Sequence, residues 1–169
     1  MPPRVLTPGN FLITHEEQRV STVLGSCVAV ALFCARTRHA ALCHAMLPRP
    51  GATLEHEAVQ QHLGRYVSEV LPLLLHHFTH HGCTRGELVA KVFGGASITP
   101  KIEKEETDRE IGLNNVTTAL AFLLEEGIPP RAIITGGNRG HHIIFNTGTG
   151  EVLHRLLDPA ATLKSLHHG

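Results

Sequence analysis

The feature that most constrains this fold is a pair of apolar runs, CVAVALF (27–33) and AALCHAMLP (40–48), separated by a polar turn. The first run is apolar at successive positions, which is typical of a strand buried on both faces in a sheet interior. Pro48 and Pro50 end the second run. We therefore predict a buried hairpin whose loop is longer than the tightest class.

Other segments show the periodicity of strands and helices. Further strands are predicted at residues 10–14, 19–24, 87–95, 131–135, 142–146 and 151–156. Helical apolar spacing predicts one helix within 65–82, which contains Pro72, and another over 114–127, with Asn114 as its N-cap and Gly127 at its C-terminus. Residues 49–63 are predicted as a surface excursion with a short helical piece, residues 99–110 as a charged loop, and residues 158–169 as a loosely held tail.

These strands and helices do not alternate strictly, so an α+β fold, a layered α/β sandwich, fits better than a doubly wound sheet. The length of 169 residues suits one domain, 1–169. Lys plus Arg equals Asp plus Glu at 15 each, and tryptophan is absent, so the sequence gives no indication of nucleic-acid binding. There is no signal-peptide pattern and no apolar run of the ~18 residues that span a bilayer. The four cysteines lack CxxC spacing, which favours free thiols in a cytoplasmic protein.

Cys27 and His44 form a candidate catalytic pair. A thiol hydrolase needs a thiolate and a base that generates it. His44 lies 17 residues after Cys27, a separation at which strand, turn and strand can return the chain beside itself. A cysteine or histidine in an apolar strand is more often an inert core residue, so the spacing alone leaves both interpretations open.

Residues before Cys27 offer further groups. Gly25 and Ser26 permit a tight turn whose amides could face a developing oxyanion. Ser21 and Thr22 each carry a hydroxyl that could orient His44. Glycines at 94 and 95 would let a substrate chain come close, whereas GGNRG (136–140) is either a substrate-framing segment or a tight turn.

The segment HHFTHH (76–81) places two histidine pairs at i,i+4, with Cys83 close by. Such pairs can chelate zinc, but histidines near a helix C-terminus also suit the helix dipole and solvent. We therefore predict no metal site, and the scatter of the 14 histidines argues against a metal-binding structural protein.

Five segments together resemble the CheD family of chemoreceptor glutamine deamidases. In chain order they are STVLGSCVAVALF (21–33), HAMLP (44–48), KVFGGASI (91–98), IGLNNV (111–116) and TGGNRGHHIIFNTGTGEV (135–152). The resemblance implies a fold shared with the catalytic domain of cytotoxic necrotizing factor toxins. It also implies a Cys-His-Thr site, with Cys27 as nucleophile and His44 as base. The family's hydroxyl lies six residues before the cysteine, which here is Ser21; Thr22 is kept as its substitute.

The implied reaction hydrolyses glutamine side-chain amides on cytoplasmic helices of chemoreceptors through a cysteine thioester, with no metal or organic cofactor. Family members can also act on glutamyl methyl esters, and some bind a CheC-type phosphatase. The alternative is an adaptor that docks on receptors or on such a phosphatase, with weak or absent catalysis.

Overall fold

The computed structural model describes residues 1–98, 105–161 and 164. Within these residues the strands are β1 (Arg4–Val5), β2 (Phe11–Thr14), β3 (Arg19–Leu24), β4 (Val28–Cys34), β5 (His39–Ala45), β6 (Val89–Gly94), β7 (Ala132–Thr135), β8 (His141–Asn146) and β9 (Val152–Leu156). The helices are α1 (His56–Gln61), α2 (Val67–His80) and α3 (Glu105–Glu125), with short 3-10 helices η1 (Leu63–Arg65) and η2 (Arg85–Glu87). The tail expected at 158–169 lies largely outside the described residues.

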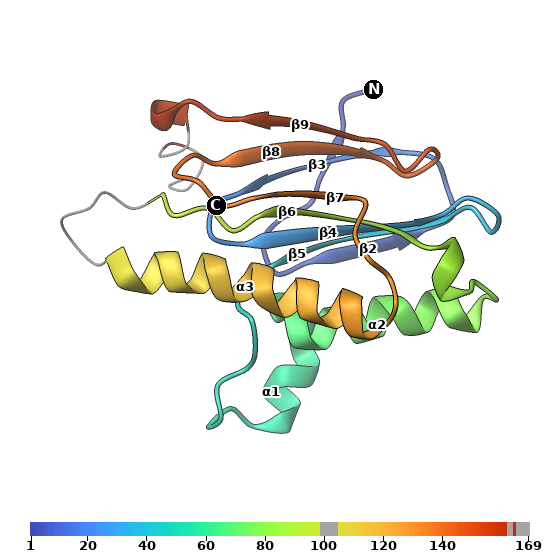
Figure 1. The fold of residues 1–169 in the computed structure, drawn as a ribbon, viewed down its shortest axis with the longest axis horizontal. Helices are drawn as coiled ribbons and strands as arrows, with labels where there is room; N and C mark the ends of the chain where they lie inside the picture. Colours follow the sequence, from blue (N-terminus) through green and yellow to red (C-terminus); the bar gives the residue numbers. More distant parts are fainter. Residues whose placement is uncertain (99–104, 162–163, 165–169) are drawn as a thin grey trace.

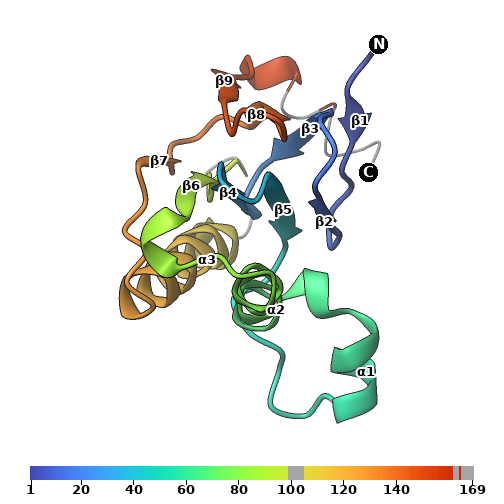
Figure 2. The ribbon, with the colours of Figure 1, turned by 90° about the vertical axis from the view of Figure 1, so that its right-hand side faces the viewer.

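The strands form two sheets, and helices α2 and α3 form a third layer (Figures 1 and 2). An outer sheet has the order β1-β3-β8-β9, and a central sheet has the order β2-β5-β4-β6-β7. Helices α2 and α3 cover the face of the central sheet that points away from the outer sheet (Figure 1). The predicted hairpin is confirmed as β4 and β5, which pair antiparallel. The molecule is thus a layered α+β sandwich.

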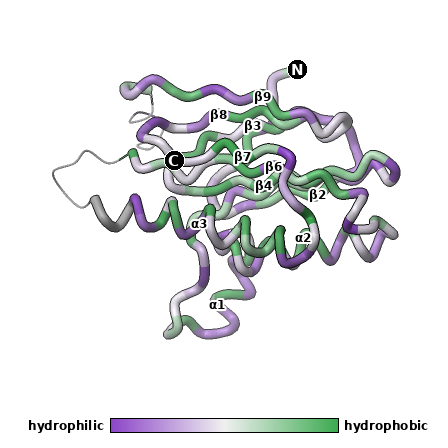
Figure 3. The backbone as a smooth tube through the Cα atoms, viewed as in Figure 1, coloured by the Kyte–Doolittle hydropathy of each residue, from purple (hydrophilic) through white to green (hydrophobic). Residues whose placement is uncertain are grey.

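Alternation along β4 builds two hydrophobic cores. Val28, Val30 and Leu32 face the helices and pack with Leu74 and Phe78 of α2. The intervening alanines of β4 belong to the other core, between the two sheets. The prediction that this strand is buried on both faces is therefore confirmed. In Figure 3 hydrophobic residues are prominent along the strands of the central sheet. In the part of the chain described here, we find no helix with the length and hydropathy of a membrane span.

Helix α2 agrees with its apolar spacing. The six apolar positions that produce this spacing are all buried: Val67, Val70, Leu71, Leu74, Leu75 and Phe78. Pro72 lies within the helix, five residues after its first residue, and its side chain is exposed. The helix ends at His80, two residues before the predicted boundary at Gly82, whose φ of 82° accompanies a hydrogen bond from the Cys83 N–H to the Phe78 carbonyl, 3.0 Å.

Helix α3 begins earlier than predicted. Its first residue is Glu105, so Asn114 is not an N-cap and residues 105–110 are helical; residues 99–104 of the predicted loop lie outside the described residues. The first turns are charged and lack apolar periodicity, which hid them, although acidic residues suit a helix N-terminus. The C-terminal prediction is confirmed: Gly127 has a φ of 72°, and the Ile128 N–H donates to the Leu123 carbonyl, 2.8 Å.

Candidate functional site

Cys27 lies where the chain passes from the outer sheet to the central sheet. Gly25 and Ser26 form a bend after β3, and β4 begins at Val28. The Cys27 side chain is partly buried and packs against the core between the sheets. The Gly-Ser bend therefore places the thiol at the edge of the inter-sheet space.

His44 faces the same inter-sheet space. On the antiparallel ladder His44 is directly opposite Ala29, and Cys27 precedes Ala29 by two residues. Side chains two residues apart on an extended strand share a face, so Cys27 and His44 are diagonal neighbours, a relation that places Cα atoms about 7–8 Å apart. His44 is almost completely buried, with 1% of its surface exposed.

Thr22 holds the imidazole of His44. Its Oγ1 lies 2.7 Å from His44 Nδ1 and donates to the carbonyl of Leu6, also at 2.7 Å. Because a hydroxyl has one proton, and that proton is on the bond to Leu6, Thr22 must accept from Nδ1–H. This assigns the tautomer: the unprotonated nitrogen of His44 is Nε2, which is the state a general base requires.

Ser21 does not contact His44, which corrects the preference for Ser21 as the orienting hydroxyl. Side chains alternate along β3, so Thr22 is buried between the sheets while Ser21 points to the opposite face. There its Oγ lies 2.8 Å from Nε2 of His142, whose Nδ1 accepts from Arg155 Nε at 3.1 Å. The hydroxyl facing His44 is five residues before Cys27.

Burial shifts the ionisation of both members of the pair. It raises the pKa of the Cys27 thiol to about 11 and lowers the pKa of His44 to about 4. The resting pair at neutral pH is therefore a thiol and a neutral imidazole, not an ion pair. Such an arrangement can generate a thiolate as a substrate is attacked, with Nε2 taking the proton.

The space beside Gly94 and Gly95 is filled by other backbone segments of the chain. A Cβ at Gly94, where φ is 103°, would lie 2.3 Å from the Cys27 carbonyl oxygen, and a Cβ at Gly95 would lie 2.9 Å from the Gly112 carbonyl oxygen. The Gly95 N–H donates to that Cys27 carbonyl, 2.8 Å. The close approach expected for a substrate is thus made by the Cys27 turn and by α3.

Asn115 is a site-supporting residue that sequence reasoning missed. It is fully buried in α3, and its Nδ2 donates to the carbonyls of Ser26, at 2.9 Å, and Met46, at 3.1 Å. One amide thereby ties together the residue before Cys27 and the chain just after β5. Because Asn115 lies in the interior of a helix that is longer than predicted, and not near a cap, no local sequence pattern indicated this role.

The glycine-rich segment 136–140 borders the same region. The Gly136 N–H donates to the Gly94 carbonyl, and the Ser97 N–H donates to the Gly137 carbonyl, both at 2.8 Å. A cavity of about 230 Å³ adjoins this segment and is lined by Thr135, Asn138 and Arg139 among others. The segment is therefore both a turn between strands and the wall of a cavity near the residues that contact the Cys27 turn.

Comparisons with known proteins agree on one family. A family model described as CheD chemotactic sensory transduction matches residues 46–156. The probable chemoreceptor glutamine deamidase CheD of Rhodospirillum rubrum is 38% identical over 163 residues, covering 96% of this chain and 87% of the relative. The probable chemoreceptor glutamine deamidase CheD 2 of Geobacter sulfurreducens is 35% identical over 158 residues, covering 94% and 92%. With a family model spanning most of the chain and relatives aligned along nearly all of it, this protein belongs to the CheD family.

Proposed function

We propose that this protein hydrolyses glutamine side-chain amides to glutamate on the cytoplasmic helices of chemoreceptors. The observation that carries the proposal is the Thr22–His44 hydrogen bond, which leaves Nε2 of a buried imidazole unprotonated on the face shared with Cys27. The names of the relatives, which describe probable chemoreceptor glutamine deamidases, supply the substrate class. The fold relation that we propose is to the catalytic domain of cytotoxic necrotizing factor toxins.

The proposed reaction begins from the neutral pair. His44 Nε2 takes the thiol proton as the Cys27 sulfur attacks the amide carbon, and amides of the bend, including Gly25 and Ser26, donate to the oxyanion. The imidazolium then gives its proton to the leaving nitrogen, which departs as ammonia and leaves a thioester. Water attacks the thioester, His44 takes a proton from that water, and the proton returns to sulfur as glutamate is released.

The substrate helix would approach the partly buried Cys27 from the side of the glycine-rich segment 136–140. A glutamine side chain is long enough to bring its amide to a partly buried sulfur while its own helix stays outside. A glutamyl methyl ester would give the same thioester with methanol as the leaving group. We place this activity in the cytoplasm, where the signalling helices of chemoreceptors lie.

One observation favours a second function, an adaptor that docks on receptors or on a CheC-type phosphatase. Burial raises the pKa of the Cys27 thiol to about 11, which is the behaviour of an inert buried cysteine as well as of a nucleophile activated only in the complex. The two functions differ in whether receptor binding is followed by chemistry.

The deciding experiment incubates a receptor cytoplasmic fragment with the protein and measures amide-to-acid conversion by mass spectrometry. We expect conversion at specific glutamines, absent with Cys27→Ala and with His44→Asn but retained with Cys34→Ala, which removes a thiol on the helix-facing side of β4. Binding of the fragment without conversion by the unaltered protein would reject the deamidase and leave the adaptor.

A further inference from the structure

Three histidines converge at the end of the sandwich where α2 stops. His39 is the first residue of β5, His77 lies in the last turn of α2, and His81 caps that helix. One ring nitrogen from each comes within 4.8 Å of the other two. The ring centroids are 4.2 Å apart for His77 and His81, 4.8 Å for His39 and His81, and 5.3 Å for His39 and His77.

Two ring nitrogens of this cluster are buried without satisfaction. Among the described residues, Nδ1 of His39 and Nε2 of His77 have no hydrogen-bond partner. Buried polar atoms nearly always find a partner, so two orphaned nitrogens in neighbouring rings call for an explanation. A cation between them would satisfy both lone pairs at once.

His81 is already oriented as a ligand. Its Nδ1 lies 2.8 Å from the carbonyl oxygen of His77, and a carbonyl can only accept, so Nδ1 carries the proton and Nε2 keeps its lone pair. Metal-bound histidines commonly donate their second ring nitrogen to a backbone carbonyl in this way.

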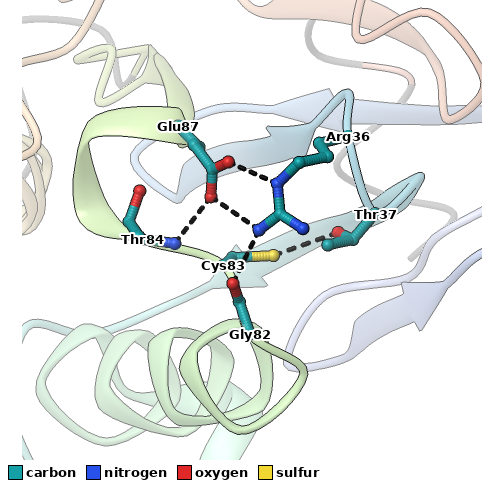
Figure 4. Close-up of polar contacts among 6 residues, drawn as sticks. All are labelled: Arg36, Thr37, Gly82, Cys83, Thr84 and Glu87. Carbon is teal, nitrogen blue, oxygen red and sulfur yellow. Dashed lines mark hydrogen bonds and ion pairs between the residues drawn. The ribbon is translucent and has the colours of Figure 1, made fainter.

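The cluster is held by contacts outside it. Figure 4 shows Arg36, from the β4–β5 turn, donating to Glu87 of η2 and to the carbonyl of Gly82, the latter at 2.7 Å. In the same turn, Thr37 Oγ1 lies 3.0 Å from Cys83 Sγ. These contacts join the turn that precedes His39 to the residues that follow His81, so the two halves of the cluster are positioned before any ion binds.

We propose that His39, His77 and His81 bind a divalent transition-metal cation, Zn²⁺, with the fourth tetrahedral position open to water. Imidazole nitrogens select Zn²⁺ and its neighbours over Mg²⁺ and Ca²⁺, which prefer oxygen. Zn–N bonds of about 2.0–2.1 Å require ligand nitrogens about 3.4 Å apart, which side-chain rotation can reach from the observed spacing. Cys83 lies outside the histidine cluster and contacts Thr37 instead.

The histidine cluster lies apart from the candidate pair of Cys27 and His44. His39 faces the helix layer, whereas His44, on the same strand, faces the outer sheet, so the metal would fasten α2 to the sheet and take no part in the reaction proposed for Cys27.

The test titrates the chelator-treated full chain with Zn²⁺ against a chromophoric competitor and records the melting temperature with and without Zn²⁺. We expect one tight equivalent, a raised melting temperature, and a tetrahedral visible spectrum when Co²⁺ replaces Zn²⁺. His81→Ala, an exposed position, should weaken binding at least tenfold and remove the stabilisation. The matched control is His80→Ala, which breaks the i,i+4 pair of His76 and His80, whose rings stack 6.0 Å apart, and should leave tight binding intact.

Equal loss in His80→Ala and His81→Ala would assign the ion to scattered surface histidines and overturn the site. So would Zn²⁺ affinity or stabilisation that is unchanged in His81→Ala, or the absence of a tight equivalent in the unaltered protein. His77→Ala provides a second variant; its binding is compared only after circular dichroism shows that it is folded.

Discussion

At the scale of single residues, the hydroxyl of Thr22 orients the imidazole of His44, the base that we propose. Thr22→Val keeps the shape of the side chain but removes the acceptor of His44 Nδ1–H and the donor to the Leu6 carbonyl. With its tautomer no longer fixed, the base should lose about a hundredfold in deamidation rate, the low end of what a positioned general base supplies. The two buried groups left unpaired should lower the free energy of unfolding by about 1–3 kcal/mol.

The matched variant is Ser21→Ala, which removes the neighbouring hydroxyl from the other face of β3. Its partner is His142, so both the rate and the stability should stay close to those of the unaltered protein. A rate measured on the receptor fragment that falls with Ser21→Ala and not with Thr22→Val would contradict the role of Thr22.

His44 also makes stability depend on pH. Unfolded, it binds a proton below about pH 6.5, whereas burial lowers its folded pKa to about 4. Between these values the unfolded chain binds more protons, so stability is full above the unfolded pKa and falls as pH falls toward 4, by about 3 kcal/mol at most.

Urea unfolding at pH 7 and at pH 4.5 measures this loss. His44→Asn keeps a donor toward Thr22 but cannot titrate, so it should lose less stability on acidification than the unaltered protein. Other histidines with lowered pKa, such as His142 and His154, contribute equally to both proteins and cancel in the comparison. Identical pH dependence in the two proteins would show that His44 is not the buried titrating group.

At the scale of elements, α3 fixes the turn that carries Cys27. Asn115→Ala removes both donors to the Ser26 and Met46 carbonyls, and we expect about 2 kcal/mol lower stability together with slower deamidation, because the turn is released. Asn114→Ala, an exposed neighbour on the same helix, should change neither. Urea unfolding and the receptor-fragment assay check both variants; equal effects of the two would mean that general helix propensity, and not the amide, is responsible.

The helices and strands were predictable where the apolar residues followed a single periodicity, whereas the contacts between these elements were not. The apolar run at 27–33 was correctly predicted as a buried strand, which is β4, and Gly127 ended a helix as its type suggests. The choice between Ser21 and Thr22 needed the inward face of β3, for which Val20 and Leu24, on Thr22's side, were the available signal. His39 lies 38 residues before His77, and Asn115 lies 89 residues after Ser26, so no local pattern could join either pair.

At the scale of the whole molecule, the central sheet contributes to both cores. Strands β4, β5 and β6 place alternate residues against the helices and against the outer sheet. Neither outer layer can keep its apolar face buried once the central sheet is lost. We therefore propose that residues 1–169 form one domain that unfolds as a single cooperative unit.

Two substitutions that shorten a side chain, one in each core, test that proposal. Phe78→Ala opens a cavity under the helices and Phe145→Ala opens one between the sheets. Each side chain is buried, and each change should lower the free energy of unfolding by about 3–5 kcal/mol.

Tyr66, the single tyrosine in a chain without tryptophan, is buried just before α2, so its fluorescence reports the helix layer while far-ultraviolet circular dichroism includes the sheets. In urea the two signals should change together in each variant, since losing either core removes the support of the central sheet. A fluorescence transition that precedes the dichroism change in Phe78→Ala would mean that the helix layer unfolds alone and that the sheets form an independent unit.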